Sequence, residues 1–517
     1  MTDTTTQVTI VGGGPVGMGL AIELGQRDID VVVIEKESTL HEIPKGQNLT
    51  QRTMEHFRTW GVEEGVRSAR VMPAGYPAAG VNSYGNLMSE YANPWFRRSD
   101  VGQYYFARNE RLPQYLTERV LRNRVSELEN VTTLYGESVT DVSLGTSGVV
   151  VRTPYRSVSS VYVVGCDGSR SIVRDLSGIE EDVSDHQKRM VLLVFRSRRL
   201  HQILEDRFGQ AAFFNVLHPD LDGYWRFLGR VDVGEGWFFH APVPDDISVD
   251  ELDYLGVLRE AVGVEFPVDI DYTGFWDLRV AIARTYRNGR AFVAGDAAHS
   301  HPPYGGYGIN TGFEDARNLG WKLDGVLRGW GGARLLDSYT DERLPVFEST
   351  ARDFIEAFIE KDREFIRLHN PVLDSEDFAL AWEKRKTGAN VGVMDYAPHY
   401  EGSPIVSGAE SSSPSAVGAH EFAARPGHHL PPLSSEQRLF EMLGPGFSLI
   451  VDVSEPNLAR VFEDAADRMK IPLTVVRTTT EGYGTRVVLV RPDHFIAWVE
   501  DGEPHSAESV LGKAVGI

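Results

Sequence analysis

The 517-residue sequence contains a single cysteine, Cys166. One cysteine excludes an intramolecular disulfide and any metal site built from clustered cysteines. It also fits a reducing compartment. Basic residues are scarce relative to acidic ones, because 52 Lys and Arg stand against 74 Asp and Glu, a formal net charge of −22. That balance argues against nucleic acid and anionic membrane as main partners, since both attract basic surfaces.

Long apolar runs are absent as well. No stretch approaches the roughly 20 consecutive apolar residues that span a bilayer. The opening residues, MTDTTTQ, lack the basic-then-apolar profile of a signal peptide. We therefore expect a cytoplasmic protein. The hydrophobic content of 42%, with 10% aromatic residues, is ample for buried cores, and the length predicts two or three domains.

The first 35 residues carry a nucleotide-binding pattern. An apolar strand is expected at 8–11, and the loop 12–17 that follows reads GGGPVG, which matches G-x-G-x-x-G. Residues 18–26 have helical periodicity, and a second strand at 31–34 ends at Glu35. A glycine loop between strand and helix, with an acid at this spacing, indicates a dinucleotide-binding βαβ unit. The alternative is a βαβ turn that binds no nucleotide.

Each glycine of this loop has a separate expected role. Gly12 would form the tight turn, Gly14 would let the backbone approach a pyrophosphate, and Gly17 would let the helix pack on the strand. Glu35 would accept hydrogen bonds from a ribose diol.

A second strand–loop–helix unit lies at 289–323, GRAFVAGDAAHSHPPYGGYGINTGFEDARNLGWKL. Residues 291–294 predict a buried strand, and Asp296 follows it. After a loop rich in Pro and Gly, Asn310 or Thr311 is expected to cap a helix. Such a helix N-terminus brings backbone N–H groups to an anionic or electron-rich ligand. His299 and His301 lack a carboxylate pattern for a metal site and are expected to pack or cap within the loop.

Periodicity predicts the elements of the other segments. Strands are expected at 104–106, 131–134 and within 139–151, and a buried strand that ends in an acid and a glycine is expected at 162–168. An aromatic-rich antiparallel sheet is expected within 186–276. Helices are expected at 109–124, 312–328 and 336–368, a linker at 407–418, and a small α/β unit with three strands and one helix from 420 onward.

Three separated motifs resemble a known family. They are GGGPVG at 12–17, YVVGCDGSRSIVR at 162–174, and the stretch 289–323. In order and spacing they resemble the single-component FAD-dependent aromatic hydroxylases, or group A flavoprotein monooxygenases. The length and C-terminal region are most similar to the branch that contains phenol and polyketide hydroxylases.

The resemblance implies an α/β fold with three parts. A Rossmann-like FAD-binding domain would comprise residues 1–73, 100–185 and 277–400. A substrate-binding β-sheet domain, inserted into it, would comprise residues 74–99 and 186–276. Residues 420–517 would form a thioredoxin-like domain that is redox-inactive, because no cysteine follows Cys166.

The resemblance also implies site residues. Asp296 would bind the ribityl chain of FAD, and Arg111, with Asn109 near it, would contact the flavin. Asp167 would contact FAD and NAD(P)H. The full predicted cofactor set is Gly12, Gly14, Pro15, Val16, Gly17, Glu35, Lys36, Arg52, Asn109, Arg111, Asp167, Asp296, Pro303, Gly306, Gly308, Ile309 and Asn310.

The substrate side departs from the family pattern. Gln47 stands where phenol hydroxylases often carry an Asp, and a Gln side chain cannot act as a base. Tyr307, where Gln is frequent in the family, could bind a substrate oxygen or simply stack. The catalytic candidates are Gln47, Pro303 and Tyr307. Candidates for lining an aromatic site are Phe214, Asn215, His218, Tyr224, Trp225, Arg226 and Trp237; for each, a place in the sheet core is the alternative.

The implied reaction is hydroxylation of a phenolic or aromatic polyketide substrate through a flavin C4a-hydroperoxide. FAD would be bound tightly but non-covalently, with NAD(P)H as transient electron donor and O2 as co-substrate. A second G-x-G-x-x-G for a separate NAD(P)H domain is absent from the sequence. Alternatives are epoxidation or Baeyer–Villiger insertion on the same scaffold, or a flavoprotein that does not oxygenate. No metal is expected, and a homodimer is expected by analogy alone.

Overall fold

A six-stranded sheet carries the glycine loop in the computed structural model, which describes residues 2–243, 252–386, 388, 390–433, 436, 438–500 and 505–517. Its central strand β2 (Val8–Val11) pairs in parallel with β3 (Val31–Glu35) and with β12 (Tyr162–Gly165). The apolar runs predicted at these positions are confirmed as buried strands. The sheet order is β18 (Arg287–Asn288), β19 (Ala291–Val293), β12, β2, β3 and β8 (Val131–Tyr135).

A smaller four-stranded sheet lies beside it. Its order is β1 (Thr2–Thr5), β11 (Arg156–Ser160), β10 (Val149–Arg152) and β9 (Asp141–Leu144). Its valines, such as Val151 and Val158, pack with Val11 and Ile34 of the six-stranded sheet in one hydrophobic cluster.

An eight-stranded, largely antiparallel sheet forms the second layer. Strands β13 (Glu181–Arg196) and β17 (Asp269–Ala283) are long, and β17 pairs with β20 (His299–Ser300), which begins three residues after Asp296. Helices α6 (Arg198–Phe208) and α7 (Tyr254–Val262) cover the outer face of this sheet, where their leucines join the sheet core. Its order is β20 (His299–Ser300), β17 (Asp269–Ala283), β13 (Glu181–Arg196), β16 (Gly236–Val243), β15 (Trp225–Arg230), β14 (Phe213–Leu217), β5 (Gly80–Tyr84) and β6 (Ala92–Trp95).

The C-terminal unit is a four-stranded mixed sheet with helices packed against it. Trp321 and Trp330 pack with Phe447 of this unit in one core, so the unit is joined to the rest by buried aromatic contacts. Beyond the predicted three strands and one helix, the described part of this unit also contains helix α13 (Leu439–Met442), strand β26 (Ile496–Val499) and helix α15 (Ala507–Ala514). The sheet order is β24 (Leu473–Thr478), β23 (Phe447–Asp452), β25 (Val487–Val490) and β26 (Ile496–Val499).

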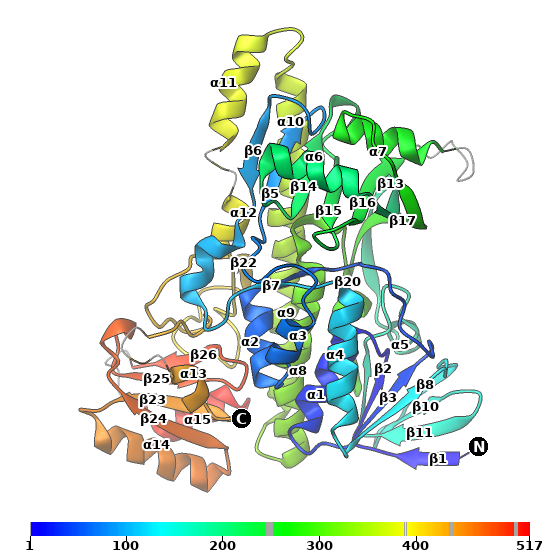
Figure 1. Ribbon diagram of the computed structural model, residues 1–517. Helices are drawn as coiled ribbons and strands as arrows, with labels where there is room; N and C mark the ends of the chain where they lie inside the picture. The colour runs from blue at the N-terminus through cyan, green and yellow to red at the C-terminus, as the bar shows by residue number, and fades with distance from the viewer. Residues whose placement is uncertain are drawn as a thin grey trace.

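Helices connect these sheets. Figure 1 shows α8 upright at the centre, with the C-terminal unit on one side and the six-stranded sheet on the other. Among the described residues, no helix is both long and apolar enough to cross a membrane. The helices are α1 (Pro15–Gly25), α2 (Gln51–Thr59), α3 (Glu63–Ser68), α4 (Gln114–Ser126), α5 (Ile172–Leu176), α6 (Arg198–Phe208), α7 (Tyr254–Val262), α8 (Gly308–Arg328), α9 (Ala333–Ser349), α10 (Ala357–Leu368), α11 (Ser375–Lys386), α12 (Val391–Met394), α13 (Leu439–Met442), α14 (Pro456–Met469) and α15 (Ala507–Ala514).

Two local predictions around residue 110 are wrong. Residues 104–106 form no strand, because a 3₁₀ helix, η1 (Arg98–Tyr104), ends there. The helix expected from 109 begins instead at Gln114. Residues 110 and 111 form strand β7 (Glu110–Arg111), which pairs with β4 (Asn48–Leu49), and Pro113 then precedes the helix.

Two predictions after residue 330 need correction. The helix expected at 336–368 is α9, a π-helical stretch (Thr350–Glu356) and α10. Pro345 lies inside α9 and lacks an N–H, which fits the change of helical pitch that follows it. The expected linker at 407–418 contains strand β22 (Ser415–Val417), which pairs with β21 (Tyr396–His399).

Helix α8 is buried on all sides, since every residue from Thr311 to Gly325 is buried. It crosses α1 closely, because a Cβ on Gly320 would lie 2.3 Å from Cγ of Glu23. Arg317 of α8 donates to both oxygens of Glu23, at 2.7 and 2.6 Å.

A second buried ion cluster joins α8 to the C-terminal unit. Glu342 of α9 accepts from Lys322 at 2.7 Å and from Arg491 at 2.5 and 2.9 Å. Arg491 also donates to Asp493 at 2.6 Å, and Asp493 in turn accepts from the Trp321 indole at 3.1 Å. These charges are fully enclosed, so each depends on its partners for the solvation that water would provide.

We predict that Arg491→Met destabilises the protein by about 3 kcal/mol or more, because Glu342 and Asp493 would stay buried without their main partner. Arg468→Met is the matched control, since its pair with Glu508 is exposed and contributes little. Denaturant unfolding of both variants measures the difference. Equal stabilities would contradict a structural role for the buried cluster.

Candidate active site

The glycine loop has two crowded positions and one open one. Gly12 has φ +105°, and a Cβ there would lie 2.2 Å from the carbonyl oxygen of Cys166. A Cβ on Gly17 would lie 2.0 Å from the oxygen of Gly12. A Cβ on Gly14 would meet nothing within 4 Å. Gly14 therefore faces open space at the start of α1, whose first N–H groups have no side-chain cap and remain available to an anion.

Glu35 closes one side of this loop. Its carboxylate accepts from the Gly13 N–H at 2.5 Å and from the Glu37 N–H at 2.8 Å. The neighbouring Lys36 is exposed. Each oxygen of Glu35 keeps lone pairs beyond these bonds, so the side chain is fixed in place yet can still accept from a ligand.

Asp296 differs from the other acids of the region. It follows Gly295, which has φ +60°, at the end of β19. Its side chain is exposed and has no hydrogen bond or ion pair among the described residues. Burial nevertheless raises the pKa of Asp296, with His299 and Lys45 acting in the opposite direction. A carboxylate that solvent can reach, but that protein surrounds, is suited to a ligand with hydroxyl donors.

Asp167 is engaged by the protein itself. It accepts from the Ser171 hydroxyl at 2.5 Å and from the Val173 N–H at 3.2 Å, at the start of α5. Burial raises the pKa of Asp167.

The loop before α8 is held by polar side chains. Gly305 and Gly306 both have φ +65°. Arg98, which the sequence did not single out, donates to the Gly305 carbonyl at 2.8 Å and lies over the Tyr307 ring. Pro303 is exposed, whereas Ile309 packs near Gly46.

The predicted cap of α8 is wrong. The N-cap residue is Tyr307, and no side chain caps the helix. Asn310 lies in the first turn and accepts from the Thr50 N–H and the Thr53 hydroxyl, at 2.9 and 2.6 Å. Its amide donates to the carbonyls of Asn48 and Gly306, at 2.8 and 2.7 Å. Asn310 therefore joins the loop to the 48–53 segment instead of capping the helix.

Gln47 and Arg111 form a buried pair between the two layers. Arg111 donates to Gln47 Oε1 at 3.1 Å and to the Ala212 carbonyl at 3.2 Å, and it also bonds the Arg230 carbonyl. Burial lowers the pKa of Arg111 to about 9. Gln47 Nε2 and Arg111 Nε are buried without a partner. Asn109, nearby in sequence, is half-buried.

Arg52, predicted to contact the cofactor, and Tyr307, predicted to be catalytic, both bind other parts of the protein instead. Arg52 donates to Glu55 at 3.0 Å, to Glu314 at 3.2 Å and to the Asp493 carbonyl, so it links α2 and α8 to the C-terminal unit. The Tyr307 hydroxyl donates to the Gly392 carbonyl at 2.8 Å, and its buried ring lies 4.3 Å from that of Tyr396. These contacts favour the packing alternative for Tyr307.

The residues predicted to line the substrate site lie on both faces of the eight-stranded sheet. Phe214 and Trp237 point to the outer face and pack with the leucines of α6. Strand alternation puts Asn215 on the inner face with Phe213, where Tyr224 and Trp225 share a cluster with Tyr307. His218 follows β14, and its Nε2 lies 3.9 Å from Glu260, which also pairs with Arg226.

The prediction of Phe214 and Trp237 as lining residues is therefore corrected, because their side chains lie in the core beneath α6 and α7. Strand alternation within 213–217 could have separated the two faces from sequence. Only the tertiary packing decides which face of the sheet lies toward the loop before α8.

His240 is a polar group on the inner face that sequence reasoning missed. Its neighbours Trp237, Phe239 and Ala241 point outward, so His240 points inward with Phe238. Its imidazole is 8% exposed and lies 6.0 Å from the Trp276 ring. Nδ1 has no partner, and burial lowers the pKa of His240 to about 4.

Two family models match the chain. The FAD binding domain matches residues 5–353, and the aromatic-ring hydroxylase C-terminal domain matches residues 423–516. The chain belongs to the FAD-dependent aromatic-ring hydroxylases. The hydroxylase is 31% identical to a putative polyketide hydroxylase of Streptomyces halstedii, over 97% of this chain and 94% of that protein. It is 29% identical to 4-methyl-5-nitrocatechol 5-monooxygenase of Burkholderia sp, over 99% and 97%.

Solved structures agree with this assignment. The rebeccamycin biosynthetic enzyme RebC with reduced flavin is 26% identical, covers all of both chains and superposes with a TM-score of 0.84. The fold is also shared with aklavinone-11 hydroxylase in complex with FAD and aklavinone, at 22% identity, full coverage of both chains and a TM-score of 0.83.

The residues of the hydroxylase fit FAD. Gly14, with the open space beside it, follows strand β2, and Asp296 follows strand β19 of the same six-stranded sheet. The two positions are close, because a Cβ on Gly295 would lie 2.9 Å from the side chain of Val16, two residues after Gly14. The fit is that of a cofactor with an anionic centre and a polyhydroxyl chain.

We predict that Gly14→Ala leaves the hydroxylase folded but weakens FAD binding at least about tenfold, because the methyl group would occupy the space next to the helix N-terminus. Gly102→Ala is the matched control, since a Cβ there also meets nothing within 4 Å. Flavin fluorescence titration of the apoproteins gives both dissociation constants. Equal FAD affinities would contradict the placement of the pyrophosphate.

Proposed function

We propose that the hydroxylase uses NADH or NADPH and O2 to place one hydroxyl group on a phenolic, multi-ring aromatic substrate. In the balanced reaction a substrate C–H becomes C–OH, NAD(P)H is oxidised to NAD(P)⁺, and the second oxygen atom leaves as water. Bound FAD supplies the hydride acceptance and oxygen activation. The protein residues bind and orient the substrate and exclude water.

The aromatic inner face of the eight-stranded sheet carries this proposal. Phe213, Phe227 and Trp276 belong to the same cluster as Tyr307 of the flavin loop. Phe227 and Trp276 are only partly buried, so they keep surface for a flat ligand. Large aromatic side chains with few polar groups suit stacked rings. Relatives whose names include polyketide and tetracenomycin substrates support the same class.

Polar atoms on this face are few and specific. Asn215 donates to Asn82 Oδ1 at 3.1 Å, and its own Oδ1 is buried without a partner. His240 and Gln47 also hold unpaired buried nitrogens. A buried polar atom without a hydrogen bond destabilises the folded protein. A hydrogen bond to a phenol or quinone oxygen of the bound substrate would remove that penalty. We propose His240 as the group that positions the phenol, since its unpaired Nδ1 can accept a hydrogen bond from the phenol hydroxyl, whereas the unpaired Nε2 of Gln47 can only donate.

We propose the cofactor set of the motif analysis without Arg52, which is assigned to packing between elements. The hydroxyl of Tyr307, a catalytic candidate, is likewise assigned to packing. Residues 74–99 and 186–276 act as the substrate-binding unit, and residues 420–517 act as a structural unit without redox chemistry. Cytoplasmic location and a homodimer stay predictions.

The reaction is tested by oxygen and electron balance. Purified FAD-loaded enzyme is given NADH or NADPH, ¹⁸O2 and a panel from simple phenols to tetracyclic phenols. We expect one labelled oxygen in the product per NAD(P)H consumed, with the highest kcat/KM for substrates of three or four rings. Substrate-dependent NAD(P)H oxidation with no labelled product would overturn hydroxylation, and a labelled ester would indicate Baeyer–Villiger insertion.

We predict that His240→Phe lowers kcat/KM by about 10- to 100-fold, through the loss of one buried hydrogen bond to the substrate. It should also increase hydrogen peroxide release per NAD(P)H. His369→Phe is the matched control and should keep both values, since its imidazole pairs with Asp377 of α11 in an exposed contact. Because the lowered pKa of His240 keeps the imidazole neutral above about pH 4, its contribution should be constant from pH 6 to 9. A His240-dependent step in kcat/KM near pH 6.5 would contradict this assignment.

A further inference from the structure

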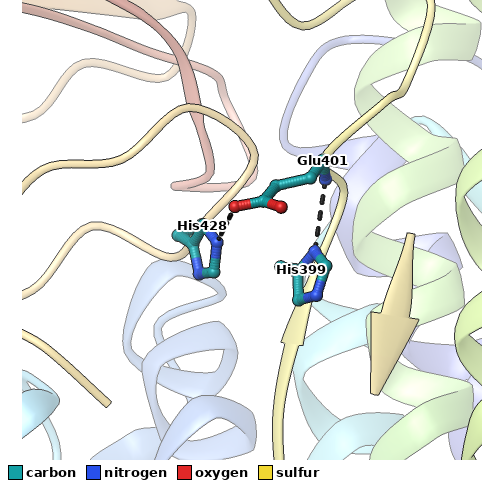
Figure 2. Close-up of side chains that lie close together, drawn as sticks. All are labelled: His399, Glu401 and His428. Atoms are coloured by element: carbon teal, nitrogen blue, oxygen red, sulfur yellow. Dashed lines mark hydrogen bonds and ion pairs between the residues drawn. The ribbon is translucent and has the colours of Figure 1, made fainter. Parts of the chain in front are cut away.

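A cluster of metal-ligand residues lies outside the flavin region. Figure 2 shows His399, Glu401 and His428 turned toward one another, where the segment after β21 meets the segment that leads into the C-terminal unit. One ligand atom from each lies within 4.8 Å of the other two. His428 Nε2 and Glu401 Oε1 are 2.7 Å apart, and the two imidazole rings are stacked with centroids 4.8 Å apart.

His399 is oriented as a metal-binding imidazole. Its Nε2 lies 3.2 Å from the Val417 carbonyl of the paired strand β22, so Nε2 carries the proton and donates. Its Nδ1 then keeps a lone pair, which accepts from the Glu401 N–H at 3.4 Å. Metal-binding histidines commonly hold their second nitrogen against a carbonyl in this way.

We propose that His399 Nδ1, His428 Nε2 and the Glu401 carboxylate bind one divalent transition-metal ion of the zinc class. Two imidazoles and one carboxylate form a common ligand set for zinc, with water in the fourth position. Tetrahedral bonds of about 2.0–2.1 Å separate ligand atoms by roughly 3.3 Å. For the ion to bind, the three ligand atoms must move closer together, His399 Nδ1 must release the Glu401 N–H, and the His428–Glu401 hydrogen bond must open.

Arg425 controls the affinity of this site for the metal ion. Its side chain donates to His428 Nδ1 at 3.0 Å, so Nδ1 carries no proton in this arrangement. When His428 binds the metal through Nε2, its Nδ1 must carry the proton. Metal binding therefore requires Arg425 to leave. The Arg425 side chain is partly exposed and already lies 3.5 Å from Glu421, which offers it an alternative partner. A cation beside Arg425 is also repelled, so removal of its charge should tighten binding.

The site would fasten two chain segments to the C-terminal sheet. The Tyr400 N–H donates to the Gly427 carbonyl at 2.7 Å, and the Ile496 N–H of β26 donates to the His428 carbonyl at 2.9 Å. A metal ion bound by His399, Glu401 and His428 would add coordination bonds to these backbone hydrogen bonds. Because it binds the folded state, it should raise the melting temperature in proportion to the logarithm of its concentration.

The test uses full-length, FAD-loaded protein stripped of metal with chelator. Calorimetric titration with ZnCl2 should show one equivalent bound, and Co²⁺ should give the visible absorption of a nitrogen- and oxygen-ligated ion. Glu401→Gln and His428→Gln should weaken Zn²⁺ binding at least tenfold. His420→Gln is the matched control, since His420 contacts the Val393 carbonyl and no ligand, and it should bind as the parent does.

Arg425→Gln should bind Zn²⁺ more tightly than the parent, and a gain of affinity cannot come from misfolding. Bound FAD and the metal-free melting temperature show whether each ligand variant is folded. The proposal is overturned if the parent binds no equivalent, if folded ligand variants bind as the parent does, or if Arg425→Gln weakens binding. None of these outcomes depends on the hydroxylation reaction.

Discussion

The arrangement of this hydroxylase depends on ion pairs buried along one helix. Asp315 of α8 accepts from Arg343 at 2.7 Å, lies 2.7 Å from His299, and also accepts from the Gly295 N–H. Further along, Arg317 and Lys322 bind carboxylates of α1 and α9. In a low-dielectric interior each charge requires its partner, so the sheets, α9 and the C-terminal unit can join α8 in only one register.

This constraint reaches the cofactor site directly. The Asp315 bond to Gly295 fixes the backbone next to Asp296, and Asp296 is left with an unpaired carboxylate. Asn310 uses its whole side chain to hold the loop before α8 against the 48–53 segment. The residues proposed for the cofactor site are thus divided between those that position the backbone and those that keep free hydrogen-bonding capacity. Fewer of these residues keep free hydrogen-bonding capacity than position the backbone.

In the eight-stranded sheet, proposed to bind the substrate, strand alternation decides which side chains are available. A sheet with helices on its outer face must bury alternate residues there, which removes Phe214 and Trp237 from the site and leaves His240, Asn215 and Phe213 on the inner face. Arg111 spans the gap, because it comes from a strand beside the flavin region and bonds two carbonyls of the sheet. Its charge, held in a dry environment, strengthens the field that the inner face presents to a bound aromatic oxygen.

The sequence by itself determined the class of fold, because the strand–loop–helix units at 8–35 and 289–323 are read from neighbouring residues, and the resemblance of its motifs to a known family indicated FAD. Within the glycine loop, Gly17 is required by the nearby backbone of Gly12, whereas Gly12 is required by the backbone of Cys166, which is far away in the chain. The substrate face, the partners of Arg52 and Tyr307, and the meeting of His399 with His428 were decided only by the tertiary structure. Those contacts join residues far apart in the chain, and their geometry depends on how whole sheets and helices pack, which local periodicity does not encode.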